Sequence, residues 1–173
     1  TTDSMNRAVA EKVSKRILPM INPGATVAVL GLSYKPFSHV TEESQGVYVA
    51  KQLSNNGLRV VAYDPMSSEM ALEDIRRKIV VLDSIEECLA QAEAVLITTP
   101  DPTFKDLTAA SFKNEWSEVL VFDFWRLLGD KIADAPGIKY VGIGTSEDDA
   151  ANTARLKKLW WGEAGDSLGT SAE

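Results

Sequence analysis

The chain has 173 residues, 45% of them hydrophobic, with a formal net charge of -7 at pH 7 and a pI near 4.8. A chain of this length buries roughly 70% of its unfolded surface, which favours one domain with appendages at its ends. The acidic balance argues against broad binding of nucleic acid or of an acidic membrane, because both require extended basic surfaces. One small phosphorylated ligand stays possible, since two well-placed cations suffice to hold it.

The cysteine count and the lengths of the apolar runs bear on the cellular compartment of the protein. Cys88 is the one cysteine, so no internal disulfide can form, which suits a reducing cytoplasm. No apolar run reaches the length of a membrane span. The N-terminus lacks the apolar core of a signal peptide and an initiator methionine, so we expect a processed chain or a piece of a longer protein.

Hydrophobic periodicity and turn residues predict alternating helices and strands. In chain order, we expect a helix at 3–20, a strand at 26–31, a helix at 41–55, a strand at 58–65, a helix at 68–78, a strand at 79–82, a helix at 83–92, a strand at 94–100, partial helix in 104–112, strands at 118–124 and 138–144, a helix at 146–161 and a loose tail. Asp3 or Ser4 is the expected cap of the first helix, Thr41 caps the second, and Gly57 ends it.

The strands are continuous apolar runs and the helices fall between them. This pattern is typical of an α/β fold, a Rossmann-like three-layer α/β/α sandwich with a mainly parallel, doubly wound sheet. We divide the chain into a helix at 1–23, a folded body at 24–145 and a C-terminal helix with its tail at 146–173.

The loop after the first strand is the first candidate site, because ligands of open α/β sheets bind beyond the carboxyl ends of the strands. Its sequence holds a single glycine, Gly31, and therefore lacks the GxGxxG dinucleotide fingerprint. Asp64 follows the second strand but lies 33 residues after Gly31, too far for the usual ribose-binding acid, and Pro65 after it favours a turn-forming role.

Lys35 is the cation that this loop presents. Gly31 permits a sharp turn, and Pro36 restricts Lys35 to extended geometry. The Lys35 ammonium and the backbone amides of 32–34 could together meet a phosphate or sugar oxygen. The alternative, which the residues by themselves favour, is an exposed lysine on a strand-to-helix loop.

A second candidate follows the fifth strand in "FDFWRLLGD". Asp123 and Arg126 fall at the same edge of the predicted sheet, and Arg126 could grip a phosphate or stack on a base. The alternative is a surface arginine paired with Asp123 or Asp130. Cys88 lies mid-helix between acids, which favours a structural role, and His39 is the single histidine, so neither a catalytic pair nor a zinc site is expected.

Several motifs in this order resemble the C-terminal domain of the UDP-glucose/GDP-mannose dehydrogenase family. They are "GLSYK" at 31–35, "ES" at 43–44, "YDP" at 63–65, "VFDFWR" at 121–126, "YVGIG" at 140–144 and the helix "SMNRAVAEKV" at 4–13, which resembles the end of the family's central helix. The resemblance covers roughly residues 5–145.

The resemblance implies a function and a site. It implies a domain that binds a UDP- or GDP-sugar, such as UDP-glucose, through Tyr34, Lys35 and Arg126. Such a domain would belong to an NAD-dependent nucleotide-sugar 6-dehydrogenase whose NAD domain, central helical domain and catalytic cysteine lie outside this chain. The chain alone would be inactive, and the parent enzyme would be a cytoplasmic homodimer of polysaccharide biosynthesis without nucleic-acid or membrane partners.

Two departures keep another hypothesis open. Glu42 stands where the family has an arginine before Glu-Ser, and His39 and Val40 stand where it has an acidic pair. A stand-alone, non-catalytic nucleotide-binding or assembly module of the same fold is therefore the alternative. A flavodoxin-like signalling domain is a third reading, weakened by the lack of an acidic cluster at the strand ends.

Overall fold

The computed structural model describes residues 2–33, 44–66 and 75–143, with side chains described from Arg7 onward. Contacts divide the chain into one compact unit at Thr1–Ile143 and a second at Gly144–Glu173, and the second lies outside the described residues. Within the described ranges, no helix is long and apolar enough to cross a membrane.

A six-stranded parallel sheet forms the centre of the first unit, in the order β3-β2-β1-β4-β5-β6. The strands are β1 (Thr26–Leu30), β2 (Arg59–Tyr63), β3 (Val80–Val81), β4 (Ala94–Ile97), β5 (Val119–Asp123) and β6 (Ile138–Gly142). The order runs outward from β1 in one direction and from β4 in the other, so the sheet is doubly wound, as predicted.

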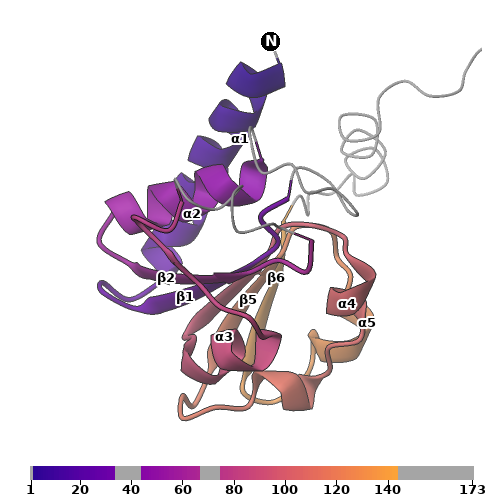
Figure 1. Ribbon diagram of the computed structural model, residues 1–173. Coiled ribbons are helices and arrows are strands. Elements are labelled where there is room, and N and C mark those ends of the chain that lie inside the picture. The colour runs from indigo at the N-terminus through magenta and orange to yellow at the C-terminus, as the bar shows by residue number, and fades with distance from the viewer. Residues whose placement is uncertain (1, 34–43, 67–74, 144–173) are drawn as a thin grey trace, which may run out of the picture. The chain divides into compact units, whose positions relative to one another are not determined.

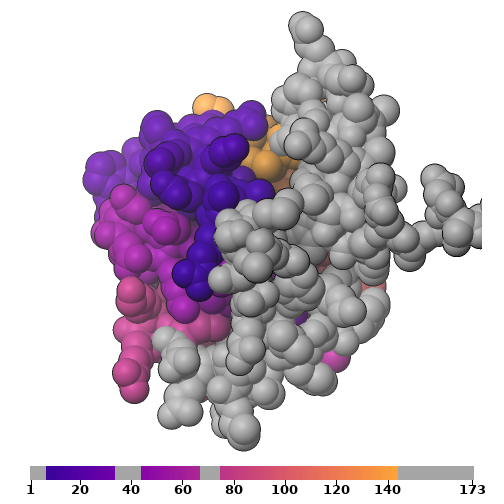
Figure 2. Space-filling model, turned by 90° about the horizontal axis from the view of Figure 1, so that it is seen from above, coloured from indigo at the N-terminus to yellow at the C-terminus, as the bar shows by residue number. Residues whose placement is uncertain are grey.

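Helices cover both faces of the sheet (Figure 1). They are α1 (Thr2–Ile17), η1 (Leu18–Met20), α2 (Gln45–Asn55), α3 (Ile85–Gln91), α4 (Pro102–Lys105), η3 (Ala109–Phe112) and α5 (Gly129–Ile132). The pair α1 and α2 lies on one face, and α3, α4 and α5 lie on the other. The N-terminal segment and α2 also lie side by side in the space-filling view (Figure 2).

Alternate residues of each central strand enter two separate cores. Val27 and Val29 of β1 are fully buried beneath α1 and α2, while Ala28 and Leu30 are fully buried on the face of α3 and α4. Because successive side chains of a strand point to opposite faces, a strand covered on both sides must be apolar throughout. This explains the continuous apolar runs of the sequence.

Two of the three expected helix ends differ from the prediction. The first helix begins at Thr2, so Asp3 and Ser4 lie inside it and neither is the N-cap. The second begins at Gln45, and its cap is Ser44 and not Thr41, because the Ser44 hydroxyl accepts from the Val47 amide. Gly57 does end this helix, with φ of 85° in the left-handed region.

The remaining predicted elements match the structure or fall outside it. The predicted helix at 83–92 is α3, capped by Ser84, and the partial helix in 104–112 consists of the end of α4 and η3. Residues 75–78 of the predicted helix at 68–78 form a turn, and its earlier part lies outside the described residues. The predicted helix at 146–161 and the tail lie outside them as well.

Candidate functional site

The carboxyl edge of the sheet brings together segments that are far apart in the sequence. β1 and β4 are neighbours in the sheet, but the chain leaves them toward opposite sides, so the strand order reverses between them. In open α/β sheets this reversal opens the crevice in which ligands bind. The loop that begins at Gly31 follows β1, and Arg126 follows β5, one strand beyond β4.

Asp64 fastens the start of the first loop. Its carboxylate accepts from the backbone amides of Leu32 and Ser33, both at 2.6 Å, and from the Ser33 hydroxyl at 2.9 Å. It also accepts from the amide of Met66 at 2.8 Å, two residues further along the chain. This last bond closes a side-chain turn, so the predicted turn-forming role of Asp64 is confirmed.

The same bonds bear on one possibility that the sequence left open. The backbone amides of 32–34 could have met a phosphate or sugar oxygen, but those of Leu32 and Ser33 donate to the carboxylate of Asp64. An amide carries one hydrogen, so these two groups are committed within the protein. Residue 34 lies outside the described residues.

Two glycines allow α2 to lie directly against the end of β1. A Cβ on Gly46 would overlap the carbonyl oxygen of Gly31, and a Cβ on Gly31 would overlap the hydroxyl of Thr99. Gly31 also has φ of 110°, and its carbonyl accepts from the buried Thr98 hydroxyl at 2.6 Å. The backbone at the end of β1 thus packs directly against the first turn of α2.

This packing bears on a dinucleotide cofactor. In the usual Rossmann site the pyrophosphate lies at the helix N-terminus against free amides of a glycine-rich turn. Here the first two amides after Gly31 donate to Asp64, and Gly46 lies against the Gly31 carbonyl. The described part of this turn does not fit a pyrophosphate in that manner.

Of the three predicted substrate-binding residues, the structure describes Arg126. Tyr34 and Lys35 lie outside the described residues, and so do His39 and Glu42. The loop that holds Tyr34 and Lys35 leaves from Ser33, at the carboxyl end of β1.

Arg126 lies in a tight turn built around Asp123. The Asp123 carboxylate accepts from the amide of Trp125 at 3.2 Å and from the amide of Leu128 at 2.9 Å. The two donor residues lie on either side of Arg126 in the sequence. Arg126 has φ of 53°, the one positive value among described residues other than glycine. A left-handed backbone is unfavourable for an arginine, so the surrounding bonds must hold it there.

Tyr140 and Thr98 attach this turn to the neighbouring strands. The Tyr140 hydroxyl, from β6, donates to Asp123 at 3.0 Å, and the Trp125 indole donates to the Thr98 carbonyl after β4 at 3.1 Å. Burial raises the pKa of Tyr140, and so do the charge of Asp123 and its hydrogen bond, while the charge of Arg126 opposes the rise. Hydrogen bonds thus tie the turn that contains Arg126 both to β6 and to the residue after β4.

Sequence reasoning missed this arrangement in part. Its alternative paired Arg126 with Asp123 or Asp130, whereas the described contacts of the Asp123 carboxylate are with two amides and a hydroxyl. Tyr140 was noted as part of "YVGIG" but given no role. A polar ring among the apolar residues of a predicted strand was the signal available, because a buried tyrosine hydroxyl needs a partner.

The described starts of the two loops lie at the same edge of the sheet. β1 and β5 are separated by β4, so their ends lie roughly 10 Å apart at the usual strand spacing. A guanidinium at one end of this edge offers planar, bidentate donors to phosphate.

Burial in α3 keeps Cys88 from acting as a nucleophile on a ligand at this edge. Cys88 is fully buried in α3, and burial raises its pKa to about 12, with a smaller contribution from the charge of Glu87. A thiol in this state is a poor nucleophile, which supports the predicted structural role. Within the described residues, no three potential metal ligands lie together.

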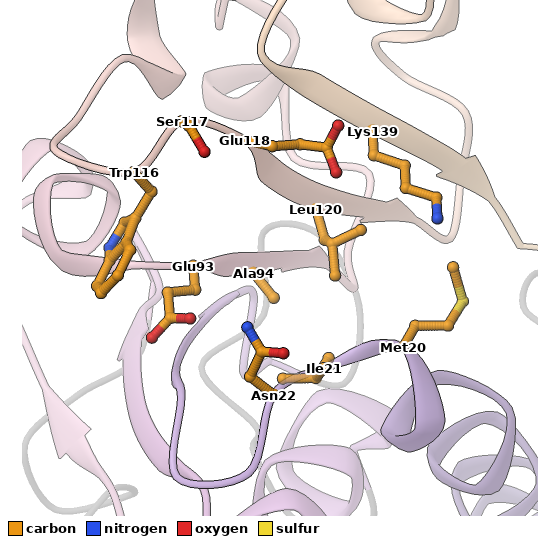
Figure 3. Close-up of a pocket in the computed structure, with 10 residues that line it drawn as sticks. All are labelled: Met20, Ile21, Asn22, Glu93, Ala94, Trp116, Ser117, Glu118, Leu120 and Lys139. Carbon is orange, nitrogen blue, oxygen red and sulfur yellow. The ribbon is translucent and has the colours of Figure 1, made fainter.

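A pocket of about 340 Å³ lies at the opposite, amino edge of the sheet (Figure 3). Its lining includes Glu118 and Lys139 beside β5 and β6, Asn22 before β1, and the exposed ring of Trp116. The lining carries charges of both signs and does not point to one class of ligand. Arg126, the predicted site residue that the structure describes, does not line this pocket.

The fold defines a Rossmann-like α/β domain, and a tight turn that contains Arg126 lies at the carboxyl edge of its sheet. A family model described as "UDP-glucose/GDP-mannose dehydrogenase family, UDP binding domain" matches residues 28–130. The chain belongs to this family. The match runs from β1 through the Arg126 turn into α5.

Named relatives agree with the family. The chain is 29% identical over 121 residues to UDP-glucose 6-dehydrogenase YwqF of Bacillus subtilis, covering 70% of this chain and 28% of the relative. It is 30% identical over 145 residues to UDP-glucose 6-dehydrogenase of Rhizobium meliloti, covering 82% of this chain and 32% of the relative. A solved UDP-glucose dehydrogenase of Pyrobaculum islandicum superposes with a TM-score of 0.60 at 28% identity, over 83% of this chain and 30% of that one. The chain thus spans less than a third of each of these relatives.

Proposed function

We propose that this chain is the nucleotide-sugar-binding part of an NAD-dependent nucleotide-sugar 6-dehydrogenase that oxidises a UDP-sugar such as UDP-glucose to the uronic acid. The observation that carries the proposal is the family match over 28–130, since it includes both the loop after β1 and the Arg126 turn. The names of the relatives favour UDP-glucose over a GDP-sugar as the first ligand to test.

The ligand would lie across the carboxyl edge of the sheet. Arg126 would bind the diphosphate with its guanidinium, and Tyr34 and Lys35 would contact the same ligand from the loop after β1. Support comes from the position of both loops at the carboxyl edge and from the strained turn that holds Arg126. Asp64 would orient the start of the Tyr34–Lys35 loop through its bonds to Leu32 and Ser33.

The oxidation itself would take place in other parts of a longer parent protein. NAD would supply the hydride acceptor there, and a catalytic cysteine outside this chain would act on the sugar, because Cys88 is buried with a raised pKa. We further propose that the parent is a cytoplasmic homodimer and that residues 1–23, 24–145 and 146–173 are its connecting helix, its sugar-binding domain and its C-terminal helix with the tail.

Titration calorimetry of the chain with UDP-glucose tests the site. We expect binding that weakens about tenfold or more in Arg126→Ala and in Lys35→Ala, because each removes a charged contact to phosphate. Arg59→Ala and Lys113→Ala are matched controls, since both side chains are exposed. Arg59 is the first residue of β2, and Lys113 lies between η3 and β5, so each comes before or at the start of its strand and not at its carboxyl end. Unchanged affinity in both site variants would reject the site.

The choice of nucleotide is tested in the same experiment. GDP-mannose and UDP alone are titrated beside UDP-glucose. Tighter binding of UDP-glucose than of GDP-mannose supports the UDP assignment, and the reverse order assigns the domain to a GDP-sugar.

A further inference from the structure

Arg126 depends on a buried residue that is itself held by a neighbouring strand. Asp123 is fully buried at the end of β5, and its carboxylate accepts from the amides of Trp125 and Leu128 on either side of Arg126 in the sequence. These bonds close a turn in which Arg126 has φ of 53°. Without them an arginine would return to the far more favourable right-handed or extended regions.

Tyr140, on the neighbouring strand β6, helps to hold the Asp123 carboxylate in place. Its hydroxyl donates to the same Oδ2 atom of Asp123 that accepts from Leu128, at 3.0 Å. Gly129 lies beside this hydroxyl, since a Cβ at that position would be 3.3 Å from it. β6 therefore determines the position of a carboxylate on β5, and through it the turn that carries Arg126.

We propose that Asp123 and Tyr140 are positioning residues that hold Arg126 in its left-handed conformation, ready to bind the diphosphate of a nucleotide sugar. The proposal rests on the proposed function in one respect, that Arg126 contacts the ligand. With its backbone held in advance, Arg126 loses less conformational freedom on binding, so its contact contributes more to affinity. Strained backbone at a binding site is the observation that such a role explains.

Tyr140→Phe is the test variant, because it removes the hydroxyl and keeps the ring in the core. The affinity for UDP-glucose is measured in the wild type, in Tyr140→Phe, in Arg126→Ala and in the double variant. We expect Tyr140→Phe to weaken binding about fivefold, the equivalent of one hydrogen bond. In the Arg126→Ala background we expect no further loss, because Tyr140 acts through Arg126.

Tyr48→Phe is the matched control. The Tyr48 hydroxyl also takes part in a hydrogen bond, accepting from Arg7, but this bond joins α2 to α1 and does not involve Asp123. We expect its affinity for UDP-glucose to equal that of the wild type. Urea unfolding of each variant shows that the binding measurements are made on folded protein.

The outcomes separate the inference from the proposed function. Weaker binding in Arg126→Ala together with unchanged binding in Tyr140→Phe overturns the positioning role and leaves the proposed function standing. An equal loss from Tyr140→Phe in both backgrounds shows a general structural role and also overturns it. Unchanged binding in Arg126→Ala removes the premise, and both the Arg126 assignment and the inference then fall.

Discussion

At the residue scale, Asp64 shows how one carboxylate determines the shape of a binding edge. It joins the ends of β1 and β2 through the amides of Leu32 and Ser33 and closes its own turn through Met66. Bonds from backbone amides to a carboxylate are stronger than bonds between neutral groups. The Asp64 carboxylate is therefore engaged by groups of the protein itself.

Replacing Asp64 with alanine leaves three backbone amides and a hydroxyl without their acceptor. We expect the free energy of unfolding to fall by about 2 kcal/mol, the usual cost of losing hydrogen bonds to a charged group. Urea denaturation measures this change. Asp134→Ala, at an exposed position, is the control and should stay within about 0.5 kcal/mol of the wild type. Equal effects of the two substitutions would contradict the assigned role.

Cys88 gives a prediction about pH. Burial raises the pKa of its thiol from 9.0 to about 12, so above pH 9 the unfolded chain releases a proton that the folded chain keeps. The stability that the folded chain gains by keeping the Cys88 thiol protonated is therefore fully present below pH 9 and is lost as the pH rises toward 12. We expect the stability of the wild type to fall more steeply between pH 8.5 and 10.5 than that of Cys88→Ala, by about 1 kcal/mol per pH unit in the upper part of this range.

The two proteins are compared by the slope of stability against pH and not by stability itself, because Cys88→Ala also leaves a cavity that lowers stability at every pH. Other groups that titrate in the same range contribute equally to both proteins. Parallel pH profiles would show that the thiol titrates alike in the folded and unfolded chains.

At the element scale, the contact between α2 and β1 depends on glycine. Gly46 lies in the first turn of α2 against the carbonyl of Gly31, where a Cβ would overlap backbone. Alanine normally favours a helix over glycine by up to about 1 kcal/mol. Here the overlap must displace the helix from the sheet, so the sign of the substitution is reversed.

We expect Gly46→Ala to destabilise the protein by about 2 kcal/mol, within the range for overpacked positions. Ala50→Gly, one turn further along the same buried face of α2, is a useful comparison, because there the loss of a methyl group should also destabilise. Thermal or urea unfolding measures both. A more stable Gly46→Ala protein would show that the helix can move away from β1 without cost.

At the scale of the whole molecule, the proposed function requires domains that this chain does not contain. The chain spans 28% and 32% of the two bacterial relatives described above. An antibody to this domain should therefore detect a native protein much larger than 18.9 kDa in cells of its source. A band at the size of the chain would instead favour the stand-alone binding module.

A catalytic assay complements that measurement. We expect the chain to bind UDP-glucose but to produce no NADH when it is mixed with UDP-glucose and NAD, because the oxidation is assigned to other domains. Absorbance at the NADH band measures the reaction. Turnover by the chain alone would contradict the division of labour that we propose.

Much of the fold follows from local sequence signals. The apolar runs at 26–31 and 94–100 contain β1 and β4, and the predicted helix at 83–92 contains α3. A strand buried on both faces must be apolar throughout, so its sequence alone reveals it. The error at Thr41 arose because several residues before α2 can cap a helix, and packing against the end of β1 selects Ser44.

The site was predictable only in outline. Gly31, Asp64 and Arg126 stand out in the sequence, because each directly follows or ends a predicted strand, and the carboxyl ends of parallel strands share one edge. Their roles depend on contacts across 32 residues between Leu32 and Asp64 and across 17 residues between Asp123 and Tyr140. No local pattern encodes such a pairing. The sequence determined the alternation of helices and strands and the family of the chain, whereas the tertiary structure decided which donors each carboxylate receives, because that depends on which strands become neighbours in the sheet.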